Sequence, residues 1–288
     1  MKKRFVVAVV LAVLLAASAY AQTTDFFALV KTGTPQDVQA AISKGADVNA
    51  KNLSGKTPLM LAAESNPNPE VITTLLKAGA DIKARDDLYD GTCLVYAAGS
   101  NRPEVITTLI EAGADINAKC TDGEDSLMWA ASHNSNPDVI TTLLKAGANL
   151  SAADMSGVTP LMFAAAYNHN PDVIVTILKA GGDVKAQDAS GETPLILAAS
   201  HNPTLSVITT LLNSGSDIEA RDIMGRTPLM IAAKASPNPE VIIAILKAGG
   251  DAKAKDKAGK TAFDYAKSNY SLRVSGTDAL KQLEEASK

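Results

Sequence analysis

Apolar and polar positions along most of the chain form two short helical blocks that turn residues separate. Residues 57–63 read TPLMLAA, which predicts a first helix with Thr57 as its N-cap and proline at its first position. Residues 68–79 read NPEVITTLLKAG, which predicts a second helix capped by Asn68. Its apolar residues make one helix face, and Gly79 supplies the left-handed C-terminal cap. A polar, extended connection then leads to the next pair of helices.

This pair of helices repeats with a strict period. Seven glycines are each separated by 34 residues: Gly45, Gly79, Gly113, Gly147, Gly181, Gly215 and Gly249. The first block returns as TPLMFAA at residues 159–165 and as TPLMIAA at residues 227–233. A period of this length is typical of stacked helical repeats. We therefore expect the apolar side chains to pack between neighbouring repeats rather than around one central core.

The blocks Thr-Pro-Leu-x-x-Ala-Ala, Glu-Val-Ile-x-x-Leu-Leu and Gly-Ala-Asp-Ile-x-Ala follow one another in six consecutive units. In this the chain resembles the ankyrin repeat, in an exported bacterial form with an Asn-Pro turn. The resemblance implies an all-α solenoid of stacked helix pairs, with β-hairpin loops projecting at one edge and a cap at each end. The expected divisions are an N-terminal capping repeat at 22–52, six repeats at 53–256 and a C-terminal capping repeat at 257–288.

The sequence departs from the family pattern in three ways, the first of which is an Asn-Pro turn between the helices that is one residue longer than the common form. Methionine replaces the histidine that commonly follows Thr-Pro-Leu, so we expect apolar packing to substitute for the hydrogen bonds that this histidine makes between repeats; these methionines are Met60, Met128, Met162 and Met230. The third repeat has an extra residue within 86–90 and Cys93 where proline is usual. Sequence drift and a contact site are the two alternative explanations of this irregularity.

The first 21 residues have the pattern of a secretory signal peptide. A basic segment at 2–4 precedes an apolar run at 5–15, and Ala19 and Ala21 occupy the two positions that signal peptidase reads. Residues 1–21 are thus expected to be cleaved, leaving Gln22 first and the product periplasmic or secreted. The alternative is an uncleaved membrane anchor, although the apolar run is short of the roughly 20 residues that span a bilayer.

Composition and charge narrow the function classes. The chain is 46% hydrophobic but only 4% aromatic, and its net charge is −4. Removal of residues 1–21 takes away three cations and no anion, leaving 24 basic against 31 acidic residues and a charge of −7. An acidic chain lacks the clustered cations that phosphate binding needs. We expect no nucleic-acid partner and no membrane span after signal cleavage.

Candidate catalytic groups are few and scattered. The three histidines, His133, His169 and His201, fall in successive repeats, and packed helices lie about 10 Å apart, so His133 and His201 should be about 20 Å apart. That spacing is too wide for a shared metal, and we predict no metal, no cofactor and no enzymatic activity. Cys93 and Cys120 lie in adjacent units. A disulfide, two separate thiols and a redox pair all remain open for them.

The resemblance implies that the first helices and the hairpin tips form a concave surface for a protein partner, bound by a monomer. One column of the first helices carries the aromatic residues Tyr96, Trp129 and Phe163. The end of these helices adds His133, Tyr167 and His201, and the tips add Tyr89, Met155 and Met224. Packing between helices is the alternative for the aromatic column. The leading hypothesis is a non-catalytic interaction scaffold; the alternative is a redox or stress-protective envelope protein that uses methionines and the two cysteines.

Overall fold

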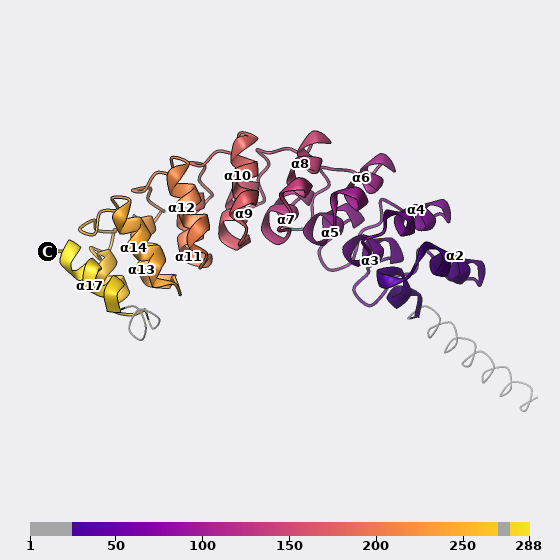
Figure 1. The fold of residues 1–288 in the computed structure, drawn as a ribbon, viewed down its shortest axis with the longest axis horizontal. Coiled ribbons are helices and arrows are strands. Elements are labelled where there is room, and N and C mark those ends of the chain that lie inside the picture. Colours follow the sequence, from indigo (N-terminus) through magenta and orange to yellow (C-terminus); the bar gives the residue numbers. More distant parts are fainter. Residues whose placement is uncertain (1–24, 270–276) are drawn as a thin grey trace, which may run out of the picture. The chain divides into compact units, whose positions relative to one another are not determined.

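The structure, a computed structural model, describes residues 25–269 and 277–288 (Figure 1). The expected signal peptide at 1–21 lies outside the described residues. The chain divides after Thr121 into two compact units, each of which is described by itself. Within the described residues all regular secondary structure is helical, with no strand.

The first unit consists of stacked helix pairs. Residues 25–32 are helical, and α2 (Pro35–Ser43), α3 (Pro58–Ser65), α4 (Pro69–Lys77), α5 (Cys93–Ser100) and α6 (Pro103–Glu111) follow. The first helix of each pair packs on the first helix of the next, as α3 does on α5, and the second helices α2, α4 and α6 pack in the same order.

The second unit continues the same organisation. Its helices are α7 (Ser126–His133), α8 (Pro137–Lys145), α9 (Pro160–Tyr167), α10 (Pro171–Lys179), α11 (Pro194–His201), α12 (Leu205–Asn213), α13 (Pro228–Ala235), α14 (Pro239–Lys247), α15 (Ala262–Ala266) and α17 (Thr277–Ala286). Helices α7, α9, α11, α13 and α15 form one layer, and α8, α10, α12 and α14 form the other, with α17 packed on α14 and α15. The expected all-α stack of helix pairs is confirmed within each unit.

The predicted caps form at both helices of a repeat. The Thr57 hydroxyl accepts from the Met60 N–H at 3.4 Å, and the Asn68 side-chain oxygen accepts from the Glu70 N–H at 2.9 Å. Gly79 ends α4 with a φ of 90°, in the left-handed region that glycine adopts without steric cost. The local sequence therefore fixes where each helix begins and ends.

Burial differs between the two layers. In the first helices residues 58–63 are all buried, whereas α4 buries only the face of Val71, Ile72 and Leu75. These helices lie between two neighbouring first helices and their own second helix, so nearly every side of them meets protein. Alanine is frequent there because small side chains let the helices approach closely.

A column of buried asparagines supplies hydrogen bonds between repeats. The Asn168 amide nitrogen donates to the carbonyl oxygens of Ala131 and Asn134 in the preceding repeat, both at 2.9 Å, and its oxygen accepts from the Asn170 N–H. Asn66, Asn101, Asn202 and Asn269 make equivalent pairs of bonds to the repeat before them.

The asparagine column adds to one expectation. We expected apolar packing to replace the hydrogen bonds that the usual histidine makes between repeats. The four methionines that replace it are indeed fully buried. Hydrogen bonds of another kind also join the repeats, because the asparagine at the end of a first helix donates to buried carbonyls at the end of the neighbouring first helix. Ser236 interrupts the column, and its hydroxyl donates instead to the Asn238 carbonyl within its own turn.

The described loops between repeats are tight turns without a strand, so the expected β-hairpins are not shown. In the turn at 154–158 the Asp154 carboxylate accepts from the N–H groups of Ser156 and Val158, each at 2.8 Å. Adjacent turns are joined by one backbone bond, here from the Met155 N–H to the Asp122 carbonyl at 3.0 Å. The Asp154 N–H also donates to the Val158 carbonyl at 3.1 Å, which closes the turn.

The irregular third repeat keeps this turn and adds one residue to it. Asp86 accepts from the N–H groups of Leu88, Tyr89 and Gly91, and Asp90 takes the left-handed conformation with a φ of 55°. Burial alone would raise the pKa of the Asp86 carboxyl, but these N–H groups and the Tyr96 hydroxyl together lower it. The extra residue is accommodated without loss of the turn.

Candidate partner-binding surface

The aromatic column of the first helices is mostly buried. Tyr96 is 4% exposed and Phe163 is 9% exposed, whereas Trp129 is partly exposed. Of the two roles that the sequence left open, Tyr96 and Phe163 therefore take the packing role.

Tyr96 has a structural role in the first unit. Its hydroxyl donates to the Asp86 carboxylate at 2.9 Å, and the Lys56 ammonium lies 3.7 Å from the centre of its ring. Burial, followed by the hydrogen bond to Asp86, raises the pKa of the Tyr96 hydroxyl. The ring thus ties the irregular loop to α5 and is not available to a partner.

Side chains at the ends of the first helices are exposed in the second unit. His133 and His201 are exposed, and Tyr167 is 53% exposed. The Trp129 ring stacks on the His133 ring, with centroids 5.3 Å apart, and Tyr167 lies 5.9 Å from His201 of the next repeat. The centre of the Phe163 ring lies 6.5 Å from the centre of the Tyr167 ring. We call these five residues, Trp129, His133, Phe163, Tyr167 and His201, the aromatic face.

Two glutamates border the aromatic face, and the sequence reading missed both. Glu124 and Glu192 each immediately precede the N-cap of a first helix and are partly buried. Burial raises the pKa of Glu124, and the nearby carboxylates of Asp154 and Asp122 add to this against the opposing effects of Trp129 and His133. The position just before the N-cap differs in residue type from repeat to repeat, and the two glutamates at this position could have been noticed in the sequence.

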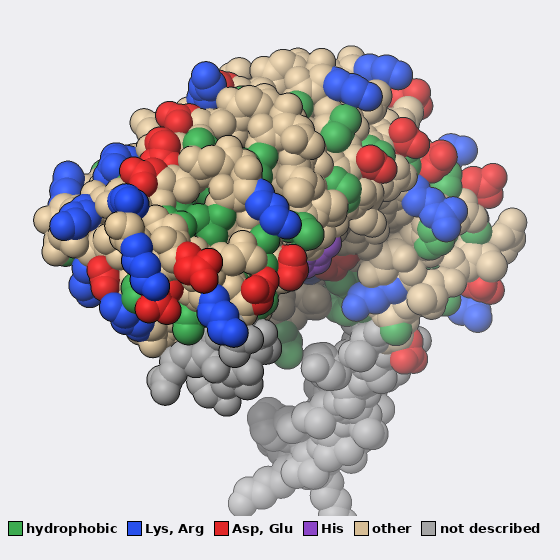
Figure 2. Space-filling view, turned by 60° about the vertical axis from the view of Figure 1, so that its left-hand side comes forward, with side chains coloured by type: hydrophobic (Ala, Val, Ile, Leu, Met, Phe, Trp, Pro, Cys, Tyr) green, Lys and Arg blue, Asp and Glu red, His purple; other side chains and the backbone are tan. Residues whose placement is uncertain are grey.

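Glu192 has the same surroundings two repeats later. Burial raises its pKa, and Asp188 and Asp222 act in the same direction, while Arg226 and His201 oppose them. Figure 2 shows that elsewhere on the C-terminal repeats Lys or Arg side chains are interspersed with Asp and Glu. The border of the aromatic face is therefore the part where acidic side chains gather beside exposed rings.

The turn tips carry exposed apolar side chains, as expected. Tyr89 is exposed in the first unit, and Met155, at 80% exposed, and Met224 are exposed in the second. Leu88 beside Tyr89 is 61% exposed and was not singled out from the sequence. Two apolar side chains are thus exposed at this tip, as Ile223 and Met224 are at the tip of a later turn.

Both cysteines are buried thiols in the first unit. The Cys93 sulfhydryl donates to the Ile82 carbonyl at 3.6 Å, and burial raises the pKa of Cys93 to about 12. A thiol with so high a pKa carries almost no thiolate at neutral pH, which is the reactive form. The structure therefore describes two buried thiols rather than the disulfide that was one of the expectations.

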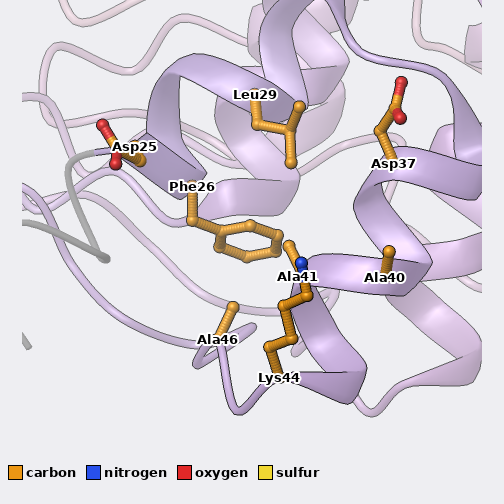
Figure 3. Close-up of a pocket in the computed structure, with 8 residues that line it drawn as sticks. All are labelled: Asp25, Phe26, Leu29, Asp37, Ala40, Ala41, Lys44 and Ala46. Atoms are coloured by element: carbon orange, nitrogen blue, oxygen red, sulfur yellow. The ribbon is translucent and has the colours of Figure 1, made fainter.

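The end of the first unit contains a cavity of about 450 Å³ between the helix at 25–32 and α2. Phe26, Leu29 and alanines of α2 line it, and the carboxylates of Asp25 and Asp37 lie on opposite sides of it (Figure 3). The Thr34 hydroxyl donates a hydrogen bond of 2.7 Å to the Asp37 carboxylate. The polar groups do not converge on one point, so the cavity has the form of an uncovered helix interface rather than of a catalytic centre.

Groups that could bind a metal do not come together either. In residues 25–269 and 277–288 no three His, Cys, Asp or Glu side chains are placed to hold an ion. His169 instead bonds to the Thr204 hydroxyl at 2.8 Å. None of the helices in this described part is long and apolar enough to cross a membrane.

Comparison with protein families decides what kind of array this is. A model described as "Ankyrin repeats (3 copies)" matches residues 26–120 and again residues 127–222, and a model described as "Ankyrin repeats (many copies)" matches residues 211–266. The chain belongs to the ankyrin-repeat family. No curated protein matches the chain.

Membership of the ankyrin-repeat family agrees with the observed geometry. The family matches run from 26 to 266 with a short gap, and this span holds the helix pairs of both units. Ankyrin repeats generally mediate protein–protein interactions and typically are not catalytic. In this ankyrin-repeat protein the exposed rings of the second unit and the apolar turn tips are the positions that such an interaction can use.

Proposed function

We propose that this ankyrin-repeat protein is a non-catalytic scaffold of the bacterial envelope that binds a protein partner. Binding uses the aromatic face of the second unit together with the exposed turn tips of that unit, Met155 and Met224. The observation that carries the proposal is the exposure of Tyr167 and its neighbours His133 and His201 on buried, closely packed helices.

Rigid support makes these side chains suited to binding. Nearly all the remaining residues of helices α7, α9 and α11 are buried. The rings at the ends of these helices are therefore held in place before a partner binds. A ring that is already ordered loses little conformational entropy on binding. Aromatic side chains are also enriched among the residues that contribute most to interface affinity.

The outer layer has a different character. The exposed sides of α8 and α10 present Thr142, Lys145 and Lys179, and the Thr142 hydroxyl is bonded to its own helix through the Asp138 carbonyl at 2.8 Å. Lysine is depleted in interface cores because its charge and side-chain entropy oppose burial. The outer layer therefore serves as the control surface for tests of the proposal.

The location in the envelope is proposed from the sequence of residues 1–21. The basic segment, the apolar run and the small residues at 19 and 21 support export and cleavage before Gln22. Mass spectrometry of the protein from a periplasmic fraction tests this directly. A chain that begins at Gln22 supports export, and an intact Met1 in the cytoplasm contradicts it.

Affinity capture from envelope extract tests the interaction. The mature protein is compared with a His133→Ala/Tyr167→Ala variant of the aromatic face and with a Lys145→Ala/Lys179→Ala variant of the outer layer. We expect the wild type and the outer-layer variant to retain the same partner and the aromatic-face variant to lose it. Circular dichroism establishes that all three are folded. Equal recovery by all three would show that the partner does not use this face.

A further inference from the structure

We propose that the aromatic face binds a basic, extended segment of its partner, with one cationic side chain at Glu124 and a second at Glu192. This inference rests on the proposed scaffold function and adds the chemistry of the partner. The juxtaposition behind it is two partly buried glutamates, two repeats apart, each next to exposed rings of the same face.

Neither glutamate has a direct ion-pair partner in the described part of the chain. Among the described residues no ion pair includes Glu124 or Glu192. Arg226, the cation near Glu192, is bonded to Asp222 at 2.5 Å. Each glutamate has further carboxylates around it, and both have a raised pKa for which burial is the first cause. A positive group placed there would gain attraction from several carboxylates at once.

The rings beside the glutamates suit the same kind of ligand. Trp129 and His133 lie next to Glu124. His201 lies near Glu192, and the Tyr167 ring is 5.9 Å from the His201 ring. The faces of Trp and Tyr rings attract Arg and Lys cations, and a carboxylate adjacent to the ring accepts hydrogen bonds from the same cation. Each end of the aromatic face thus combines a ring and a carboxylate.

Charge complementarity excludes other occupants. An acidic segment would bring like charges against Glu124 and Glu192. A purely apolar segment would cover two carboxylates that form no direct ion pair in the described part of the chain, and desolvation of such a charge is costly. A segment with Arg or Lys avoids both costs and also complements the mature charge of −7 that removal of residues 1–21 leaves from 24 basic and 31 acidic residues.

The spacing of the glutamates sets the spacing of the cations. Two repeats separate them, which corresponds to about 20 Å at roughly 10 Å for each packed helix. An extended chain rises about 3.3 Å per residue. The two cationic side chains should therefore be about six residues apart in the partner segment.

Synthetic peptides test this inference on the mature protein. The probe is a fluorescein-labelled Gly/Ala peptide with two arginines six residues apart. Comparison peptides have the arginines two residues apart, have glutamine in their place, or have glutamate in their place. Fluorescence anisotropy gives the dissociation constant of each. We expect the six-residue spacing to bind best and the glutamine and glutamate peptides to bind about tenfold more weakly or worse.

Two variants distinguish the effect of the local carboxylate on peptide binding from the effect of the overall charge. Glu192→Gln should weaken binding of the six-residue-spaced peptide about fivefold, because one charge-assisted contact is lost. Glu240→Gln removes the same charge from the exposed first turn of α14 and should change binding less than twofold. Equal weakening by both variants would overturn the inference, as would equal binding of all four peptides.

The peptide experiment and the capture experiment fail in different ways. If the arginine peptide displaces the captured envelope partner, both the scaffold function and the basic segment are supported. If a partner is captured through the aromatic face and the arginine peptide does not displace it, the scaffold function stands and the basic segment is wrong. If no partner is captured and no peptide binds, both are wrong.

Discussion

Asn168→Ala should destabilise the second unit more than any exposed polar substitution in the same repeat. The Asn168 amide is buried and makes two bonds of 2.9 Å to the Ala131 and Asn134 carbonyls, and it accepts a third from the Asn170 N–H. Each bond contributes about 1 kcal/mol net, and buried carbonyls that lose their donor carry a further penalty. The expected loss in the free energy of unfolding is about 3 kcal/mol.

Asn170→Ala is the matched control for Asn168→Ala. Asn170 has the same side chain two positions later, but its bonds to the Ser135 carbonyl and from the Asp172 N–H are exposed. Removal of such a cap costs about 1 kcal/mol. Urea unfolding is followed through Trp129, the single tryptophan, which lies in the helix against which α9 packs. Losses that agree within about 0.5 kcal/mol would refute the role of the buried column.

Three further predictions concern backbone strain, acid and thiol reactivity. Gly191→Ala should cost more stability in urea unfolding than Gly215→Ala, since both have positive φ but only at Gly191 would a Cβ lie 3.2 Å from a backbone nitrogen of the adjacent turn; equal costs would contradict this. Folding lowers the pKa of the Asp86 carboxyl from 3.8. The stability that the ionised carboxylate contributes is therefore present above pH 3.8 and is lost as the pH falls through the lower pKa of the folded state. The difference in melting temperature between wild type and Asp86→Asn should therefore shrink from pH 7 to pH 2.5, and a constant difference would be evidence against it. Cys93, with its pKa raised to about 12, should react with a thiol reagent about 100-fold more slowly in the native chain than in urea; fast native reaction, or no thiol in urea, would show that Cys93 and Cys120 are not both buried thiols.

The helix pairs were predictable because their signals are local. The Thr57 and Asn68 caps, the prolines that follow them and the terminal glycines each depend on residues within one turn of the helix. Repetition of these signals every 34 residues made the helix boundaries recoverable without any knowledge of tertiary contacts. The family match confirms what this repetition indicated.

The asparagine column was not predictable in the same way. Asn66 and Asn68 stand in the same turn and look alike in the sequence, yet Asn68 caps its own helix while Asn66 bonds to carbonyls of Val30 and Gly33 in the preceding repeat. Only the stacking of repeats places those carbonyls within reach. The recurrence of this asparagine in most repeats was visible in the sequence, but its hydrogen-bond partners were not.

The candidate surface was recoverable in part. Exposure of Tyr167, Met155 and the histidines agrees with their place at helix ends and turn tips, where the repeat pattern leaves side chains without a neighbour. The burial of Tyr96 depends on Asp86 and Lys56, which come from other parts of the repeat array. Whether a ring is covered depends on such non-local partners, and sequence position alone does not supply them.

Site-specific photo-crosslinking most directly tests whether the aromatic face is where the partner binds. A photoreactive benzoylphenylalanine is placed at position 167 of the aromatic face or, as the control, at position 145 on the exposed side of α8, and the mature proteins are irradiated in envelope extract. We expect a covalent adduct with one partner protein from position 167 and none from position 145. An adduct with the same partner from position 145 and none from position 167 would contradict the assignment of the binding surface.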